Sequence, residues 1–532
     1  MNRSSACLAL LLSTSLFACS KQEETPKLYA VEEVPLSQVS ADLASGATTS
    51  VAATEAYIAR MKEYDGGLNA VILIAPDALQ QAAASDQRRK AGNAIGPLDG
   101  VPVLFKDNLD ATGMPTTAGS FALEANLPAQ DSEVVKRLRG AGVVILGKVN
   151  TSQFAGFRNT KAFNGSTVGQ GPHNPYDLTR TAGGSSNGSG IAASVSFAAG
   201  TIGTETSGSI TSPSSLNGVV GLKPTIALVS RRGIVPISLT QDTAGPMTRT
   251  VRDAAMLLTV IAGSDPADRW SVDADAHKAD YVSALDAGAL SGKRLGVVRG
   301  LRGYNERTQP VLDEALAVLT TQGAELVEIS NDAFVDVSPE MRVILLHDFK
   351  EDLNAYLAGT PATVKVRTLT DLIAFSKSDP RESMHAMDLF EDADATTGGR
   401  QNPEYIKNLE YAKRTTQAEG IDKMLQANNV VALVTITGNT AQPIPPDGMA
   451  SGHPVALVPK GQTTPSITTY AAVAGYPHLT VPMGEVSGLP VGLSFVGTAW
   501  AEPLLMSLGY AYEQASHKRL PPAAYKAGAA PK

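Results

Sequence analysis

Three segments of the chain carry side chains that could attack or activate a carbonyl group. Lys106 ends a short apolar run, where burial would lower the pKa of its amine and let it act as a base. Ser185 follows two consecutive glycines, which permit a tight backbone turn. Ser209 ends the run Gly203-Thr-Glu-Thr-Ser-Gly-Ser, a loop able to present successive backbone N–H groups to one anionic oxygen. Each segment alone is weak evidence, because a lysine at a strand end usually reaches solvent and a Gly/Ser run is usually a turn.

A different nucleophile is also conceivable from the sequence. The run Gly184-Ser-Ser186-Asn-Gly188 matches G-x-S-x-G, the nucleophile elbow of α/β hydrolases. That elbow follows a strand, whereas turn-forming residues, Asn174-Pro-Tyr-Asp, precede this run. It also requires a histidine, and we interpret the seven histidines as structural or surface residues: His173, His277, His347, His385, His453, His478 and His517.

Other hydrolase classes are excluded or disfavoured by missing motifs. The chain has no S-x-x-K run, which excludes serine β-lactamases and penicillin-binding proteins. It has no H-E-x-x-H run and no clustered histidines, which disfavours zinc hydrolases. The two cysteines, Cys7 and Cys19, both lie near the N-terminus, which disfavours a cysteine nucleophile, a thiolate metal site and an internal disulfide.

The combination of the three segments is specific, and further runs accompany it. Lys106 lies 79 residues before Ser185, which lies 24 residues before Ser209. With the flanking runs, this pattern resembles the amidase signature family and its Ser–cis-Ser–Lys triad. The matching runs are Gly100-Val-Pro-Val-Leu-Phe-Lys-Asp-Asn, Gly113-Met-Pro-Thr-Thr-Ala-Gly-Ser, Ile145-Leu-Gly-Lys-Val-Asn, Asn174-Pro-Tyr-Asp, Gly221-Leu-Lys-Pro-Thr, Asp242-Thr-Ala-Gly-Pro-Met, Ala474-Gly-Tyr-Pro and Gly488-Leu-Pro-Val-Gly-Leu.

The resemblance implies a role for each residue in hydrolysis of a small-molecule or peptide amide by water. Ser209 would be the nucleophile, Ser185, preceded by a cis peptide bond, would relay the proton, and a neutral Lys106 would be the base. The reaction would pass through an acyl-enzyme, with no metal and no cofactor. The backbone N–H groups of four residues would form the oxyanion hole: Thr206, Ser207, Gly208 and Ser209.

The sequence departs from the common family pattern at four positions. Glu205 stands where Asp is usual, Thr211 where Arg is frequent, and Gln153 where Glu is frequent. The first two resemble a subgroup that includes bacterial peptide amidases acting on C-terminal amides. Ser207 replaces a usual glycine, and its Cβ would restrict the backbone of the loop.

Alternating β-branched runs and helical stretches indicate the α/β class. We predict one large amidase domain over 36–525, with a mixed central sheet surrounded by helices. Its core would come from about 90–260 and 466–500, and the less family-like stretch 262–465 would supply the substrate-pocket walls. The predicted elements are strands at 101–105, 143–146, 479–482 and 491–496, and helices at 36–64 with a break at Gly46, 133–140, 191–202, 308–322, 338–358 and 402–428.

The N-terminus has the features of an export signal. Arg3 precedes an apolar stretch too short to span a bilayer, and Leu16-Phe-Ala-Cys19 resembles a bacterial lipobox. We therefore expect a lipoprotein-type signal peptide over 1–18, lipidation at Cys19, and a polar tether over 19–35. Ser20 favours the outer membrane, so the expected location is the periplasm or that membrane, with the lipid as the only membrane attachment.

Composition narrows the partners and leaves two alternatives. The 532 residues carry a net charge of −8 without a basic cluster, so nothing supports a nucleic-acid partner. One alternative is an inactive amidase fold used as a binding lipoprotein. The other is a protein like the A subunit of glutamyl-tRNA amidotransferase. An export signal is hard to reconcile with this second alternative. The sequence does not identify the acyl group or the oligomeric state.

Overall fold

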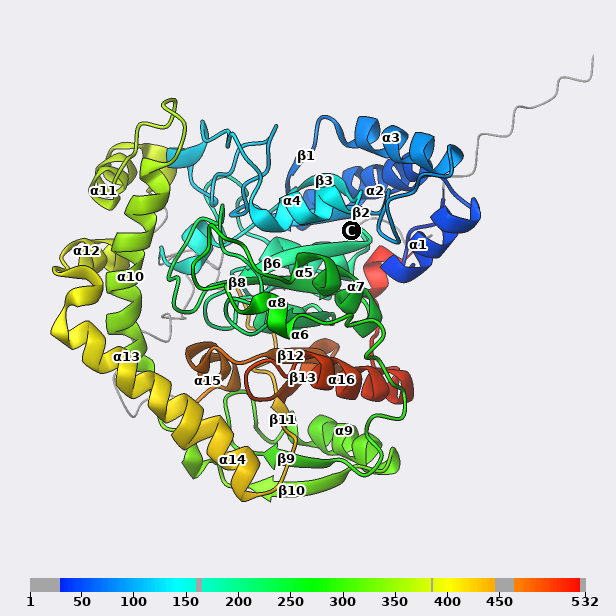
Figure 1. Cartoon of the computed structure of the whole chain (residues 1–532), viewed down its shortest axis with the longest axis vertical. Helices are drawn as coiled ribbons and strands as arrows, with labels where there is room; N and C mark the ends of the chain where they lie inside the picture. The colour runs from blue at the N-terminus through cyan, green and yellow to red at the C-terminus, as the bar shows by residue number, and fades with distance from the viewer. Residues whose placement is uncertain (1–28, 159–164, 384–385, 445–463, 527–532) are drawn as a thin grey trace, which may run out of the picture.

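One mixed sheet of 11 strands runs through the computed structural model, which describes residues 29–158, 165–383, 386–444 and 464–526 (Figure 1). The expected signal peptide, the lipidation site and most of the tether lie outside the described residues. In spatial order the strands are β1 (Val71–Ile74), β3 (Val144–Val149), β2 (Pro102–Lys106), β6 (Gly200–Glu205), β8 (Thr243–Thr248), β7 (Val220–Lys223), β12 (His478–Val486), β13 (Leu489–Val496), β11 (Ala432–Ile436), β9 (Arg294–Val298) and β10 (Glu325–Ile329).

The first half of the sheet is the part that positions the predicted catalytic residues. Strand β2 is parallel to both β3 and β6, its two neighbours. All residues of β2, β3 and β6 are buried, as expected for parallel strands covered on both faces. Since parallel strands end at the same sheet edge, Lys106 at the end of β2 comes close to the last residues of β6.

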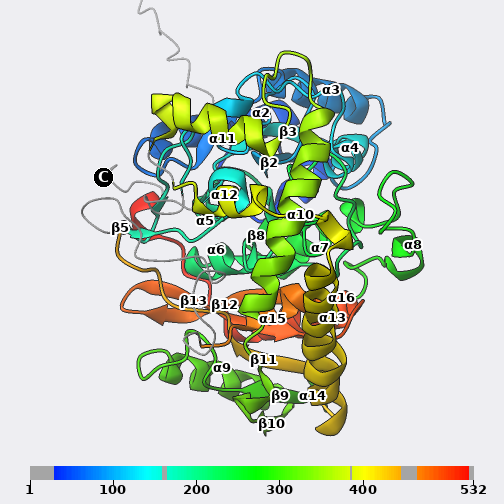
Figure 2. The same cartoon turned by 90° about the vertical axis from the view of Figure 1, so that its left-hand side faces the viewer.

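Helices cover both faces of this sheet. In Figures 1 and 2, α10 and α13 run along one side of the molecule, whereas α7, α9 and α16 lie on the opposite side in Figure 1. A small separate sheet pairs β4 (His173–Asn174) with β5 (Asp177–Thr181). The α-helices are α1 (Leu36–Ser45), α2 (Ser50–Tyr64), α3 (Ala78–Lys90), α4 (Glu133–Gly140), α5 (Asn187–Ser194), α6 (Thr211–Leu216), α7 (Val251–Ile261), α8 (Ala274–His277), α9 (Gln309–Thr321), α10 (Ser338–Ala358), α11 (Leu369–Ser378), α12 (Asp388–Asp394), α13 (Pro403–Thr416), α14 (Asp422–Ala427), α15 (Ile467–Ala474) and α16 (Glu502–Ser516).

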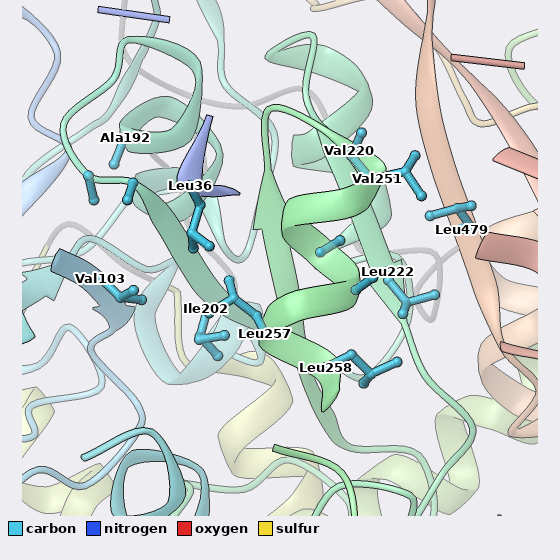
Figure 3. Packing of buried hydrophobic residues seen from close by; sticks show 14 of the residues in the cluster. Leu36, Val103, Ala192, Ile202, Val220, Leu222, Val251, Leu257, Leu258 and Leu479 are labelled. Carbon is cyan, nitrogen blue, oxygen red and sulfur yellow. The ribbon is translucent and has the colours of Figure 1, made fainter. Parts of the chain in front are cut away.

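The apolar core joins these helices to the sheet. Figure 3 shows Leu257 and Leu258 of α7 beside Ile202 of β6 and Leu222 of β7. All four side chains are fully buried, and burying each contributes roughly 1.5–3 kcal/mol. This packing supports β6, the strand that leads into the loop containing Ser209.

Several predicted elements are confirmed, and others need correction. The break at Gly46 is confirmed, since α1 ends at Ser45 and Gly46 caps it with φ 76°. The expected helix over 191–202 is wrong: α5 ends at Ser194, and β6 begins at Gly200. A run of small apolar residues does not distinguish a buried helix from a buried strand, and tertiary packing decides between them here.

The expected division between core and pocket walls is also incomplete. Strands β9, β10 and β11, all within 262–465, extend the same sheet. The predicted helix over 402–428 exists as α13 and α14, joined by a π-helical turn at Gln417–Ile421. None of the helices in the described ranges combines the length and the apolar character that a membrane span requires.

Candidate active site

Lys106 lies fully buried at the carboxyl end of β2 and contacts two hydroxyl groups. Its Nζ lies within hydrogen-bonding distance of three oxygens: 2.7 Å from Ser185 Oγ, 2.8 Å from Thr204 Oγ1 and 3.2 Å from Thr204 O. Burial lowers the pKa of Lys106 to about 7, while the negative charges of Asp242 and Glu205 act in the opposite direction. The amine is therefore largely neutral in mildly alkaline solution, as a proton acceptor must be.

Thr204 determines how this amine is oriented. A neutral amine has two N–H groups and one lone pair, and Thr204 offers two acceptors, Oγ1 and O. With both N–H groups directed to Thr204, the lone pair is left for the hydroxyl of Ser185. Asn108 Nδ2 donates to Thr204 Oγ1 at 2.9 Å and fixes that hydroxyl in place. Thr204 was not among the predicted site residues, because its contact with Lys106 depends on the pairing of β6 with β2.

Ser185 is held in a tight turn just before α5. The Gly184–Ser185 peptide bond is cis, and the Ser185 side chain is almost fully buried. Its carbonyl accepts from Ser152 N at 3.0 Å, which links the turn to the segment after β3.

Ser209 lies beside this turn, in the loop between β6 and α6. Its carbonyl oxygen accepts from Ser186 N at 3.1 Å, so the loop is attached to the residue after Ser185. Within the described part of the chain, Ser209 Oγ makes no hydrogen bond, and the residue keeps 9% of its surface exposed. A hydroxyl that no protein group engages is suitable for attack on a substrate.

The loop before Ser209 has the donors of an oxyanion hole. Among the described residues, no protein group accepts from the backbone N–H groups of the four predicted donors, Thr206, Ser207, Gly208 and Ser209. Gly208 adopts φ 81°, whereas Ser207 is not among the residues with positive φ. The extra Cβ at Ser207 is therefore compatible with the loop, and only Gly208 needs the freedom of glycine.

Glu205 anchors the other side of the same loop. Its Oε2 accepts from Ile210 N at 2.8 Å, from Thr211 N at 2.9 Å and from Thr211 Oγ1 at 3.1 Å. The residues at 205 and 211, both unusual for the family, thus contact one another. This contact fixes the chain immediately after Ser209.

A second buried carboxylate supports the loop from the opposite direction. Asp242 accepts from Thr206 Oγ1 at 2.5 Å and from the backbone N–H groups of Ile237 and Ser238. Burial raises the pKa of Asp242 to about 6, although these hydrogen bonds act to lower it. Helix α10 holds the same segment, because Asp348 accepts from Ser238 Oγ at 2.6 Å.

Helix α15 packs against the outer side of the oxyanion loop. A Cβ added to Gly208 would lie 3.1 Å from Thr468 Oγ1, and Ser207 Oγ donates to Thr469 Oγ1 at 3.3 Å. The loop therefore lies between α15 and the strands that carry Lys106 and Thr204.

The nucleophile-elbow alternative does not fit this geometry. Ser186 is fully buried, its Oγ donates to Thr204 O at 2.9 Å, and it accepts from Thr204 N at 3.2 Å. Its hydroxyl is therefore a structural link between α5 and β6. Among the described histidines, His478 bonds Ser494 Oγ and His347 bonds a carbonyl of its own helix, so neither serves Ser186.

Comparisons with known proteins agree with the fold and the motifs. The family model described as Amidase matches residues 52–506. The solved structure of a native peptide amidase from Stenotrophomonas maltophilia is 41% identical, with a TM-score of 0.85 over 92% of this chain and 98% of that chain. A probable amidase from Arabidopsis thaliana is 34% identical over 97% of each chain. The A subunit of a glutamyl-tRNA(Gln) amidotransferase from Roseiflexus is 34% identical over 92% of this chain and 98% of its own length. The chain therefore belongs to the amidase signature family.

Proposed function

We propose that this protein hydrolyses linear carboxylic amides, and C-terminal peptide amides in particular, through a Ser–cis-Ser–Lys triad. The observation that carries the proposal is the 2.7 Å contact between the buried Lys106 Nζ and Ser185 Oγ, in a turn that Ser186 N connects to Ser209 O. The peptide-amide substrate class is supported by the Glu205–Thr211 subgroup pattern and by the likeness to the Stenotrophomonas peptide amidase.

The proposed reaction begins with attack of Ser209 Oγ on the amide carbonyl carbon. The proton of Ser209 passes to Ser185 Oγ while the proton of Ser185 passes to the lone pair of Lys106 Nζ. Negative charge develops on the carbonyl oxygen, and the N–H groups of the predicted donors, Thr206, Ser207, Gly208 and Ser209, stabilise it. One such donor is typically worth about 3 kcal/mol in the transition state.

The second half of the reaction reverses these transfers. Protonated Lys106 returns its proton through Ser185 to the leaving nitrogen, which departs as ammonia and leaves an ester on Ser209. Water then gives a proton to the Ser185–Lys106 pair and attacks the ester, and the pair returns that proton to Ser209 Oγ as the ester bond breaks. The products are the free acid and Ser209 in its original state.

A panel of amides tests the substrate class. We expect ammonia release from C-terminal peptide amides with a higher kcat/KM than from simple aliphatic or aryl amides, because a peptide supplies additional binding contacts. Matched peptides with a free C-terminal carboxylate serve as controls and should release no ammonia. A preference for simple amides would contradict the peptide-amide assignment, while ammonia release only in the presence of glutaminyl substrates and partner subunits would favour an amidotransferase role.

We also propose that the protein is exported and anchored by a lipid at Cys19. The supporting pattern is the charged start at Arg3, the short apolar stretch and the sequence Leu16-Phe-Ala-Cys19. Mass spectrometry of the N-terminal peptide from membranes should find Cys19 as the first residue, with acyl chains attached. An unmodified N-terminus at any other residue would contradict the anchor.

A further inference from the structure

A buried carboxylate from the region outside the family motifs contacts the loops around the active site. Glu382 ends a 3₁₀ turn, Pro380–Glu382, between α11 and α12, and it is fully buried. Its Oε1 accepts from Ser120 Oγ at 2.9 Å, from Phe121 N at 2.8 Å and from Thr167 Oγ1 at 2.9 Å. One side chain thus joins two loops far from it in sequence.

The other oxygen of Glu382 balances a buried positive charge. Oε2 accepts from Gln153 Nε2 at 2.7 Å and pairs with Arg158, whose side chain is 1% exposed. Arg158 Nη2 also donates to Glu382 O at 2.8 Å. Gln153 can hydrogen-bond Arg158, as its Oε1 does at 3.1 Å, but an amide cannot neutralise a guanidinium. Without Glu382, Arg158 would be a buried charge without a counter-ion, which is costly.

The turn that Glu382 contacts through Gln153 is strained and lies next to Ser185. In the turn Gln153–Gly156, Phe154 has φ 48°, Ala155 has φ 54° and Gly156 has φ 90°. Left-handed conformations are unfavourable for residues other than glycine, and they persist only where surrounding contacts enforce them. The residue before this turn, Ser152, donates its N–H to Ser185 O. A Cβ added to Gly156 would lie 3.7 Å from Ser185 Cβ.

We propose that Glu382 is a positioning residue for the amidase reaction: it neutralises Arg158 and holds the turn Gln153–Gly156 against Ser185. Where family members often carry Glu at 153, this chain carries a neutral Gln, and the negative charge comes from a separate segment 229 residues away. The segment between α11 and α12 is thereby coupled to the relay serine. This inference rests on the proposed function, because it concerns the reactivity of the same triad.

The test exploits the matched pair of residues at 153 and 382. Glu382→Gln places an amide N–H group at the oxygen to which both Gln153 and Arg158 donate, so these two donors lose their shared acceptor. The double variant Glu382→Gln/Gln153→Glu restores one negative charge beside Arg158. In it, residue 382 donates and residue 153 accepts, the reverse of the parent hydrogen bond. Glu391→Gln is the control, since Glu391 is half exposed and pairs only with Lys377 among the described residues.

The readout is the rate at which a fluorophosphonate labels the full-length protein, measured together with kcat for ammonia release per labelled site. We expect Glu382→Gln to lower both rates at least tenfold, the double variant to recover to within threefold of the parent, and Glu391→Gln to leave both unchanged. Because rates are counted per labelled site, a merely smaller folded fraction would not move them.

Two results would overturn the proposal: unchanged rates in Glu382→Gln, or a double variant no faster than Glu382→Gln. If Glu382→Gln does not fold, Thr167→Val is used, which removes one donor to Glu382 and keeps the charge; lowered rates would then support the proposal, and unchanged rates would overturn it. A parent protein that is labelled but releases no ammonia from amides contradicts the proposed function alone, and the labelling rates still decide the role of Glu382.

Discussion

Replacing Ser209 by alanine will lower kcat for ammonia release by about 10⁴-fold or more, as loss of the nucleophile does in other serine hydrolases. The side chain makes no hydrogen bond to the described residues, so its removal should leave the fold intact. Equal melting temperatures of the parent and Ser209→Ala, measured by circular dichroism, would confirm that the loss is catalytic. The measurement of activity is ammonia release from a peptide amide under substrate saturation.

Ser186→Ala provides the comparison that separates the two candidate nucleophiles. The Ser186 hydroxyl links α5 to Thr204, so its loss is expected to reduce stability and to slow turnover by no more than about tenfold. The opposite pattern, with Ser186→Ala inactive and Ser209→Ala active, would identify an elbow-type hydrolase. Equal ammonia release by Ser209→Ala and the parent would show that the activity does not arise from this triad, and no release by either would favour the binding-lipoprotein alternative.

Activity should fall as the solution is acidified, because Lys106 must be neutral to accept a proton. With a pKa of about 7, the neutral fraction is about nine-tenths at pH 8 and about one-tenth at pH 6. We therefore expect kcat/KM to drop about tenfold between these values and tenfold for each further unit. Lys106→Ala should lose activity at every pH, and Lys106→Arg as well, because a guanidinium stays charged. The measurement is the profile of kcat/KM against pH between 5 and 9.

Glu205→Gln tests whether the fall of kcat/KM at acidic pH arises from protonation of Lys106. The charge of Glu205 stabilises the protonated form of Lys106, so removing this charge lowers the pKa of Lys106. The fall of kcat/KM should then occur at lower pH. Gln retains an oxygen that can accept from Ile210 N and Thr211 N, which preserves the loop. If kcat/KM of Glu205→Gln fell at the same pH as that of the parent, Lys106 would be contradicted as the base. A kcat/KM that does not change through mildly acidic pH would contradict it as well.

The parts of the fold predictable from sequence are those where local pattern and burial agree. The apolar run ending at Lys106 is a buried strand, and the run 338–358 is a helix with the predicted bounds. The motif spacing anticipated that Lys106 and Ser185 would meet, which they do at 2.7 Å. Strands β9 to β11 could not be assigned to the same sheet, because their pairing depends on contacts between distant segments rather than on local pattern.

The least predictable parts of the site are single residues whose role arises only from tertiary contacts. Thr204 has an ordinary place in a strand, and its function becomes visible only once β2 lies beside it. Glu382 is one acid in a charge-rich stretch, and nothing local indicates that it is buried beside Arg158. Ser207 was expected to constrain its loop, yet the left-handed conformation falls on Gly208 alone.

The hydrogen bonds between α10 and the segment before β8 have a practical consequence for engineering this enzyme. Asp348 and Asp352 of that helix accept from Ser238 Oγ and Leu239 N, in the segment whose Asp242 contacts the oxyanion loop. A mutant library of this protein should therefore leave these two aspartates untouched, because replacing them would remove support from the loop that carries Ser209. Selection for altered specificity would then act on other positions while the loop that carries Ser209 keeps its support.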